Sequence, residues 1–142
     1  MAAYNKFHVF TTDITNKVHD FDADVFKWVF TNTAPVATNA LYSDISATEL
    51  ANGSGYTTGG LATGTITVAN TSGVRKVTLP AVTLTATGAV GPFRYQVLVN
   101  TTPTSPLKPL VMWYDYGSSV TMANTETFTL TPDASGGLFT IT

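Results

Sequence analysis

The best candidate for metal chemistry is the acidic run HDFDAD, which spans His19–Asp24. Its aspartates stand at alternate positions, as the ligands do at the start of a calcium-binding loop. Such a loop also needs a glycine at its sixth position and a glutamate at its twelfth, and this chain has Val25 and Thr31 there. The run therefore predicts no metal site. It predicts a polar junction whose aspartates accept hydrogen bonds from free backbone groups.

A second candidate is the stretch SDISATELANGSGYTTGG, residues 43–60, which carries four glycines within residues 53–60. A phosphate-binding P-loop needs a lysine followed by Ser or Thr directly after its glycines, and this stretch contains no lysine. Ser54 does not lie in the G-x-S-x-G elbow of a hydrolase nucleophile either. We interpret residues 43–60 as a surface loop that contacts another protein.

Nucleophilic or acid–base catalysis lacks its usual residues. The chain has no cysteine, and its two histidines, His8 and His19, both fall in one predicted helix. The remaining carboxylates considered for an acid–base pair are isolated in sequence: Glu49, Asp115, Glu126 and Asp133. The sequence thus predicts a protein that is not an enzyme, with no catalytic residue, no cofactor and no metal ligand.

The aromatic run Trp113, Tyr114 and Tyr116 allows two interpretations. Exposed aromatic side chains can stack on a sugar or a nucleic-acid base. Such a run more often fills both faces of a central strand, and we favour that packing role.

The composition is unusual in its scarcity of charge. Of the 142 residues only 11% are charged, against about a quarter in an average soluble domain, and the net charge is −2. This excludes the basic footprint of a nucleic-acid-binding protein. The chain has no apolar run long enough to cross a membrane, and the segment MAAYNKFHVF, which lacks an apolar stretch followed by a cleavage site, does not predict a secretory signal. Its 27 threonines favour a β surface that stays hydrated without charge, which suits a protein held against other proteins.

The elements that position these residues begin with a helix. Apolar residues recur at spacings of three and four from Phe7 to Phe21, and this pattern predicts a helix over residues 4–19. We divide the chain into an N-terminal helix or arm, residues 1–22, and a β domain, residues 23–142. The helix either packs on the chain's own sheet or docks on a neighbour.

From residue 24 onward, apolar residues recur at every second position instead of every third or fourth. Phe26, Trp28 and Phe30 share one face of a predicted strand, and further short strands follow to the C-terminus. Pro80 must lie at an edge, a bulge or a break between strands. Short strands separated by glycines predict an all-β fold, an antiparallel β-sandwich or barrel in one domain.

Several segments resemble a family of small virion structural proteins of tailed bacteriophages. They are MAAYNKF, VFKWVFTNTAPVATN, ELANGSGYTTGG, PLVMWYDYGSSVTM and ETFTLTPDASGGLFTIT, so the resemblance covers nearly the whole chain. It implies a jelly-roll-like β-sandwich that acts as a capsid cement or decoration protein. Such a protein lies on the outer surface of the capsid, bridges major capsid protein subunits and forms homo-oligomers, dimers or trimers.

Two other functions stay open at this stage. One is a tail or head–tail joining protein, and the other is a carbohydrate-binding β-sandwich. Under the cement hypothesis we expect contacts through the glycine-rich loop, with Tyr56 as an exposed anchor at its tip beside Asn52, Thr57 and Thr58. We expect further contacts from Tyr4 and Phe7 in the N-terminal arm.

Overall fold

The computed structural model describes residues 3–142 and shows a mostly β protein, with 45% of residues in strands and 9% in helices. The strand pairings are all antiparallel, and the described strands do not close into a barrel. The strands are β1 (Ala3–Lys6), β2 (Phe26–Thr31), β3 (Leu61–Ala62), β4 (Thr67–Thr71), β5 (Val74–Thr78), β6 (Val82–Thr85), β7 (Val90–Asn100), β8 (Leu110–Met122), β9 (Thr127–Leu130) and β10 (Phe139–Ile141). The helices are α1 (Val9–Thr15) and the 3₁₀ turns η1 (Tyr42–Asp44) and η2 (Ser46–Thr48).

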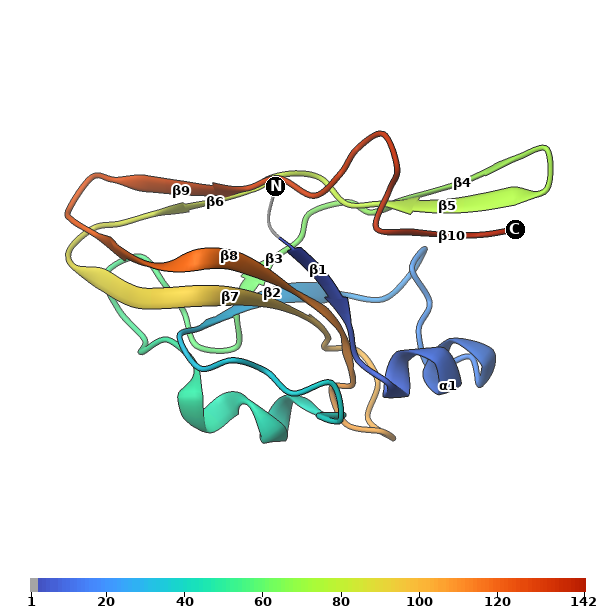
Figure 1. Cartoon of the computed structure of the whole chain (residues 1–142), viewed down its shortest axis with the longest axis horizontal. Coiled ribbons are helices and arrows are strands. Elements are labelled where there is room, and N and C mark those ends of the chain that lie inside the picture. The colour runs from blue at the N-terminus through green and yellow to red at the C-terminus, as the bar shows by residue number, and fades with distance from the viewer. Residues whose placement is uncertain (1–2) are drawn as a thin grey trace.

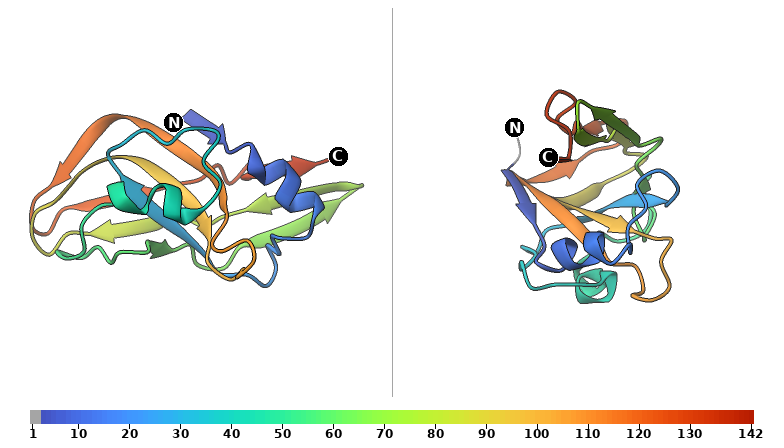
Figure 2. Two further views of the ribbon diagram at one scale, coloured as in Figure 1. Left: turned by 90° about the horizontal axis from the view of Figure 1, so that it is seen from below. Right: turned by 90° about the vertical axis from the view of Figure 1, so that its right-hand side faces the viewer.

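The central layer is a five-stranded sheet in the order β1-β8-β7-β2-β3. Two smaller sheets, β10-β5-β4 and β6-β9, lie along one of its faces (Figure 1). Seen end-on, the small sheets, the central sheet and the helical segments follow one another from top to bottom (Figure 2). Pro80 stands between β5 and β6, so the predicted break between strands is confirmed.

The larger core fills the space between the central sheet and the small sheets. It contains the three aromatic side chains of β2 that the sequence placed on one face, Phe26, Trp28 and Phe30. Leu84 of β6 and Leu130 of β9 reach the same core from the opposite layer. Burial of these side chains removes apolar surface from water and holds the two layers together.

A smaller core lies on the other face of the central sheet. Val29 and Val97 project there from β2 and β7, and Phe7 and Ile45 pack against them. The segment that carries η1 and η2 covers this face (Figure 2). Because β2 is buried on both sides, four of the six residues in its sequence FKWVFT are apolar, on both faces of the strand.

The N-terminal helix is shorter than predicted, and the expected span of residues 4–19 is wrong. Residues 3–6 form β1 and pair with β8, since β8 offers an edge with unpaired backbone groups. The helix α1 ends at Thr15, and Lys17 then adopts a left-handed φ of 59°. Phe10 of α1 enters the larger core. The helix therefore packs on the chain's own fold; the first two residues of the predicted segment 1–22 lie outside the described residues.

The aromatic run on β8 fills both cores, as the packing interpretation predicted. Trp113 belongs to the smaller core and Tyr114 to the larger one, where it stacks on Trp28 at 5.6 Å between ring centroids. Tyr116 is the member of the run that stays exposed. The three rings therefore form no common platform.

Candidate functional site

The predicted loop of residues 43–60 begins with the short helical turns η1 and η2, and its glycine-rich part, residues 50–60, is a tightly folded turn between η2 and β3. We call residues 50–60 the glycine-rich loop. Gly53 and Tyr56 exchange two backbone hydrogen bonds of 2.8 and 3.0 Å. At Gly55 the loop touches β6 so closely that a Cβ atom would lie 2.2 Å from the carbonyl oxygen of Thr85. Glycine is required there because any side chain would collide with that backbone, and φ is +98°.

Tyr56 does not project from this loop, so the prediction of an exposed anchor is wrong. Its side chain is 2% exposed and packs edge-to-face on Phe30. The hydroxyl accepts a 3.1 Å hydrogen bond from the Phe30 N–H and donates one of 2.7 Å to Glu49 Oε1. The neighbouring residues in the loop are too small to cover the ring. Its apolar surface therefore avoids water by packing into the core.

Glu49 is the residue that fixes the loop, and it was missed as a functional position. Its Oε1 also accepts a 2.7 Å hydrogen bond from the Gly59 N–H, and its Oε2 accepts one from the Tyr42 hydroxyl. Burial, together with the bond to Glu49, raises the pKa of Tyr42 to about 12, and the same causes raise the pKa of Tyr56. We call Glu49, Tyr42, Tyr56 and Gly59 the Glu49 cluster.

The other predicted contact residues of the loop face solvent. Asn52, Thr57 and Thr58 are exposed. Asn52 Oδ1 accepts a 3.2 Å hydrogen bond from the Thr58 N–H, which ties the two sides of the loop together. The loop thus presents small polar side chains on a backbone held from below by Glu49.

The two N-terminal contact predictions have different outcomes. Phe7 is fully buried in the smaller core, so it is not available to a partner and its assignment is wrong. Tyr4 is 43% exposed on β1. Because β1 and β3 are opposite edges of the central sheet, the structure does not bring Tyr4 beside the glycine-rich loop.

The HDFDAD run forms a polar junction between α1 and β2. Asp24 Oδ2 accepts hydrogen bonds from the Asp20 N–H at 2.9 Å and from Asn100 Nδ2 at 2.6 Å. Asp20 Oδ1 accepts one of 3.0 Å from the Asp22 N–H. The predicted capping role of these aspartates is confirmed. Within residues 3–142 no group of three His, Cys, Asp or Glu side chains is placed to hold a metal ion.

His19 and Asp13 form a buried pair beside this junction. His19 Nε2 and Asp13 Oδ2 lie 3.9 Å apart, too far for a hydrogen bond, and neither atom has a hydrogen-bond partner. His19 Nδ1 lies 3.2 Å from Asn100 Nδ2. Burial lowers the pKa of His19 to about 4, although the charge of Asp24 opposes this shift. Burial also raises the pKa of Asp13. We call Asp13, His19, Asp24 and Asn100 the His19 cluster.

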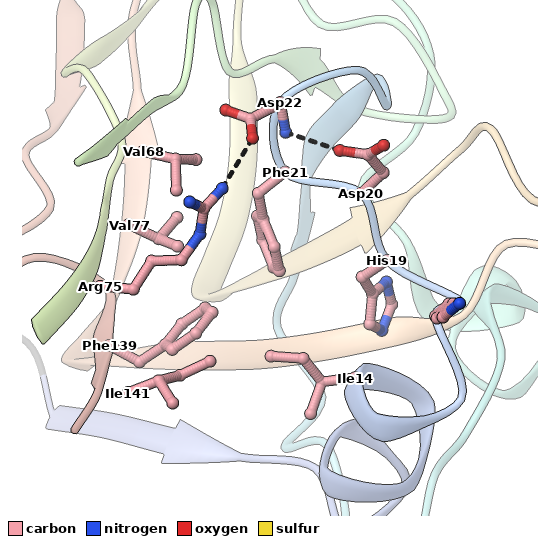
Figure 3. Close-up of a pocket in the computed structure, with 11 residues that line it drawn as sticks. Ile14, His19, Asp20, Phe21, Asp22, Val68, Arg75, Val77, Phe139 and Ile141 are labelled. Atoms are coloured by element: carbon pink, nitrogen blue, oxygen red, sulfur yellow. Dashed lines mark hydrogen bonds and ion pairs between the residues drawn. The ribbon is translucent and has the colours of Figure 1, made fainter. Parts of the chain in front are cut away.

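A groove of about 340 Å³ runs between this junction and the β10-β5-β4 sheet (Figure 3). Its apolar lining comes from three distant parts of the chain: Ile14, Phe21, Val68, Val77, Phe139 and Ile141. Arg75 reaches across it to Asp22, with 2.8 Å between Nη2 and Oδ2. Sequence reasoning missed the groove because no local pattern joins these segments.

None of the described helices is long and apolar enough to span a membrane. Comparison of the chain with protein-family models, with curated proteins and with solved structures finds no match.

Proposed function

We propose that this chain is a non-enzymatic structural protein of a tailed-phage particle, a cement protein on the outer surface of the capsid that bridges major capsid protein subunits. The resemblance of its segments to small virion proteins gives the class. The structural observation that best supports a binding role is the glycine-rich loop, which exposes polar side chains on a backbone fixed by Glu49.

A fixed loop suits this role because ordering a flexible loop opposes binding. A loop that already holds its bound shape loses less conformational entropy on contact. The bonds from Tyr56 and Gly59 to Glu49 Oε1 supply that order in the free protein. Contact through Asn52, Thr57 and Thr58 then depends on shape and neutral hydrogen bonds.

The scarcity of charge supports attachment in many copies. A protein with 11% charged residues and a net charge of −2 meets little like-charge repulsion when copies crowd a lattice. Many weak contacts on a symmetric shell add up through avidity. We further propose that the two layers of sheet form a β-sandwich with jelly-roll-like connections.

The absence of catalysis is part of the proposal. Two of the polar side chains considered for acid–base chemistry are engaged within the fold: Glu49 holds the loop, and His19 is buried. The carbohydrate-binding alternative has less support, since Trp113 and Tyr114 are buried and Tyr116 alone of that run is exposed.

Quantitative mass spectrometry of purified particles tests the proposal. A ratio to the major capsid protein on the order of one to one is expected for a lattice-covering cement protein. A few copies per particle would instead indicate a tail or head–tail joining protein. Absence from the particle would overturn the structural role.

A pair of variants tests the loop itself. Thr57→Glu places a charge on the exposed loop, and Thr140→Glu places the same charge on β10, at the far end of the molecule (Figure 1). We expect Thr57→Glu to weaken binding to particles stripped of this chain by about tenfold or more, as for a contact residue worth above 1 kcal/mol. Thr140→Glu should bind as the wild type does. Equal binding by both variants would remove the loop from the proposal.

A further inference from the structure

The hairpin formed by β4 and β5 projects at one end of the molecule (Figure 1). In the sheet order β10-β5-β4, the strand β4 has a neighbour on one side only. Four of its five residues are exposed, and Val68 is half-buried. An edge of this kind presents backbone donors and acceptors that another β-strand can pair with.

The β4 edge lacks the sequence features that usually prevent an edge strand from pairing with another strand. Exposed edge strands are normally interrupted by a lysine, a proline or a bulge. The sequence of β4 is TVANT, which has no charge, no proline and no glycine. Its register with β5 is continuous from Thr67 to Thr71. A strand left open in this way is suited to pairing.

The hairpin register tells which backbone groups face outward. Thr71 and Val74 flank a two-residue turn at Ser72 and Gly73, both with positive φ. In such hairpins the flanking pair is hydrogen-bonded and the pairs then alternate. Thr71, Ala69 and Thr67 therefore bond to β5, and the N–H and C=O groups of Val68 and Asn70 point away from it.

We propose that β4 is a self-association surface, where two copies of this chain pair antiparallel about a two-fold axis at Ala69. Val68 then exchanges backbone hydrogen bonds with Asn70 of the partner subunit, and Asn70 with the partner subunit's Val68. The two three-stranded sheets become one continuous sheet. The inference does not depend on the proposed capsid role.

A second copy fits this edge better than an unrelated strand because the sequence of β4 complements itself. Thr67 lies opposite Thr71 of the partner subunit, a favourable cross-strand pair, and Ala69 meets its own copy at the axis. The cations Arg75 and Lys76 lie on β5, one strand behind the edge. In the pair, the two β5 strands are three strand spacings apart, about 14 Å, beyond the Debye length of about 10 Å at 0.1 M salt.

Two charge variants test the β4 edge separately from the rest of the β10-β5-β4 sheet. Ala69 and Thr140 both stand opposite Lys76, one from β4 and the other from β10. Ala69→Glu and Thr140→Glu thus place the same charge beside the same lysine within one chain. Only Ala69→Glu brings two glutamates together at the proposed axis.

Sedimentation equilibrium of the purified chain, up to about 1 mM, measures the dimer. We expect a concentration-dependent dimer for the wild type and for Thr140→Glu, and a dissociation constant raised about tenfold or more by Ala69→Glu. Asn70→Pro removes an outward N–H without removing a bond to β5, and should also abolish pairing.

Hydrogen exchange adds a local readout. The amides of Val68 and Asn70 should become protected as the wild-type concentration rises, but not in Ala69→Glu. A wild type that stays monomeric at about 1 mM overturns the proposal. So does a dimer that Ala69→Glu and Asn70→Pro leave unchanged, or one that Thr140→Glu weakens equally.

Discussion

The Glu49 cluster and the His19 cluster both hold an irregular segment against the central sheet, but they do so differently. In the Glu49 cluster both carboxylate oxygens and both tyrosine hydroxyls are hydrogen-bonded. In the His19 cluster, Asp13 Oδ2 and His19 Nε2 are buried without a partner. A satisfied network fixes one geometry, whereas an unsatisfied buried group costs free energy that neighbouring contacts must offset.

The two clusters therefore stabilise their irregular segments in different ways. The glycine-rich loop depends on a network of hydrogen bonds to Glu49. The junction after α1 depends on the protonation of one histidine, because its charged form would be buried. The first cluster should therefore respond to mutation and the second to pH.

The largest effect is expected from Tyr56→Ala, which removes the centre of the Glu49 cluster. It empties a buried ring site and should lower the free energy of unfolding by about 3 to 5 kcal/mol. Tyr56→Phe keeps the ring but leaves the Phe30 N–H without its acceptor, and should cost about 1 to 3 kcal/mol. Urea unfolding measures both. A loss below about 1 kcal/mol for Tyr56→Ala would contradict the central role.

Acid should destabilise the His19 cluster. Its folded-state pKa of about 4 lies below the unfolded value of 6.5, so the unfolded chain binds more protons between these values. Stability is therefore lost as the pH falls from 6.5 toward 4, by up to about 3 kcal/mol. Asp13 acts in the opposite sense, because its raised pKa means that protonation relieves a burial cost.

Thermal unfolding across this pH range checks the acid effect. The wild-type Tm should fall with pH, and His19→Gln should flatten the slope. His8→Gln serves as the control, because His8 is exposed on the same part of the chain. Identical slopes for the wild type and His19→Gln would remove the distinction between the two clusters.

Glu49→Gln should have an intermediate effect. The amide keeps one acceptor oxygen for Tyr56 and Gly59 but loses the negative charge, so we expect a loss of about 1 to 2 kcal/mol in the free energy of unfolding. The pKa of Tyr42 should also fall below its value of about 12, since the bond to Glu49 helps to raise it. Absorbance titration of tyrosinate follows this change. An unchanged titration would mean that burial alone raises the pKa.

The smallest effect is expected from Asn52→Ala. Its bond to the Thr58 N–H is exposed, and its loss should cost less than about 0.5 kcal/mol in urea unfolding. A loss of unfolding free energy close to that of Glu49→Gln would show that the hydrogen bond between Asn52 and Thr58, rather than Glu49, orders the loop.

The sequence predicted the β class, the presence of an N-terminal helix and the shared face of Phe26, Trp28 and Phe30 on β2. These features depend on local periodicity. The prediction failed at residues 4–6, which the predicted helix included ahead of the first residue of its apolar pattern, Phe7, and which pair with β8 instead. Propensity is local, whereas a vacant sheet edge more than a hundred residues away is invisible in a short window.

The site was harder to predict than the fold. The sequence predicts Tyr56 as an exposed anchor at the tip of the loop, but its burial follows from contacts with Phe30 and Glu49, which lie elsewhere in the chain. Glu49 itself could have been suspected, since it is a rare charge standing directly before a glycine-rich loop. The groove could not, because its walls meet only after folding.

The pairing of β1 with β8 has a consequence for synthesis on the ribosome. Ala3 lies opposite Asp115, so β1 emerges more than a hundred residues before the strand that it pairs with and waits until β8 has been made. Long-range pairings of this kind also slow folding. The central sheet is therefore completed late, and a product terminated before β8 would leave the N-terminal strand with no place to bind.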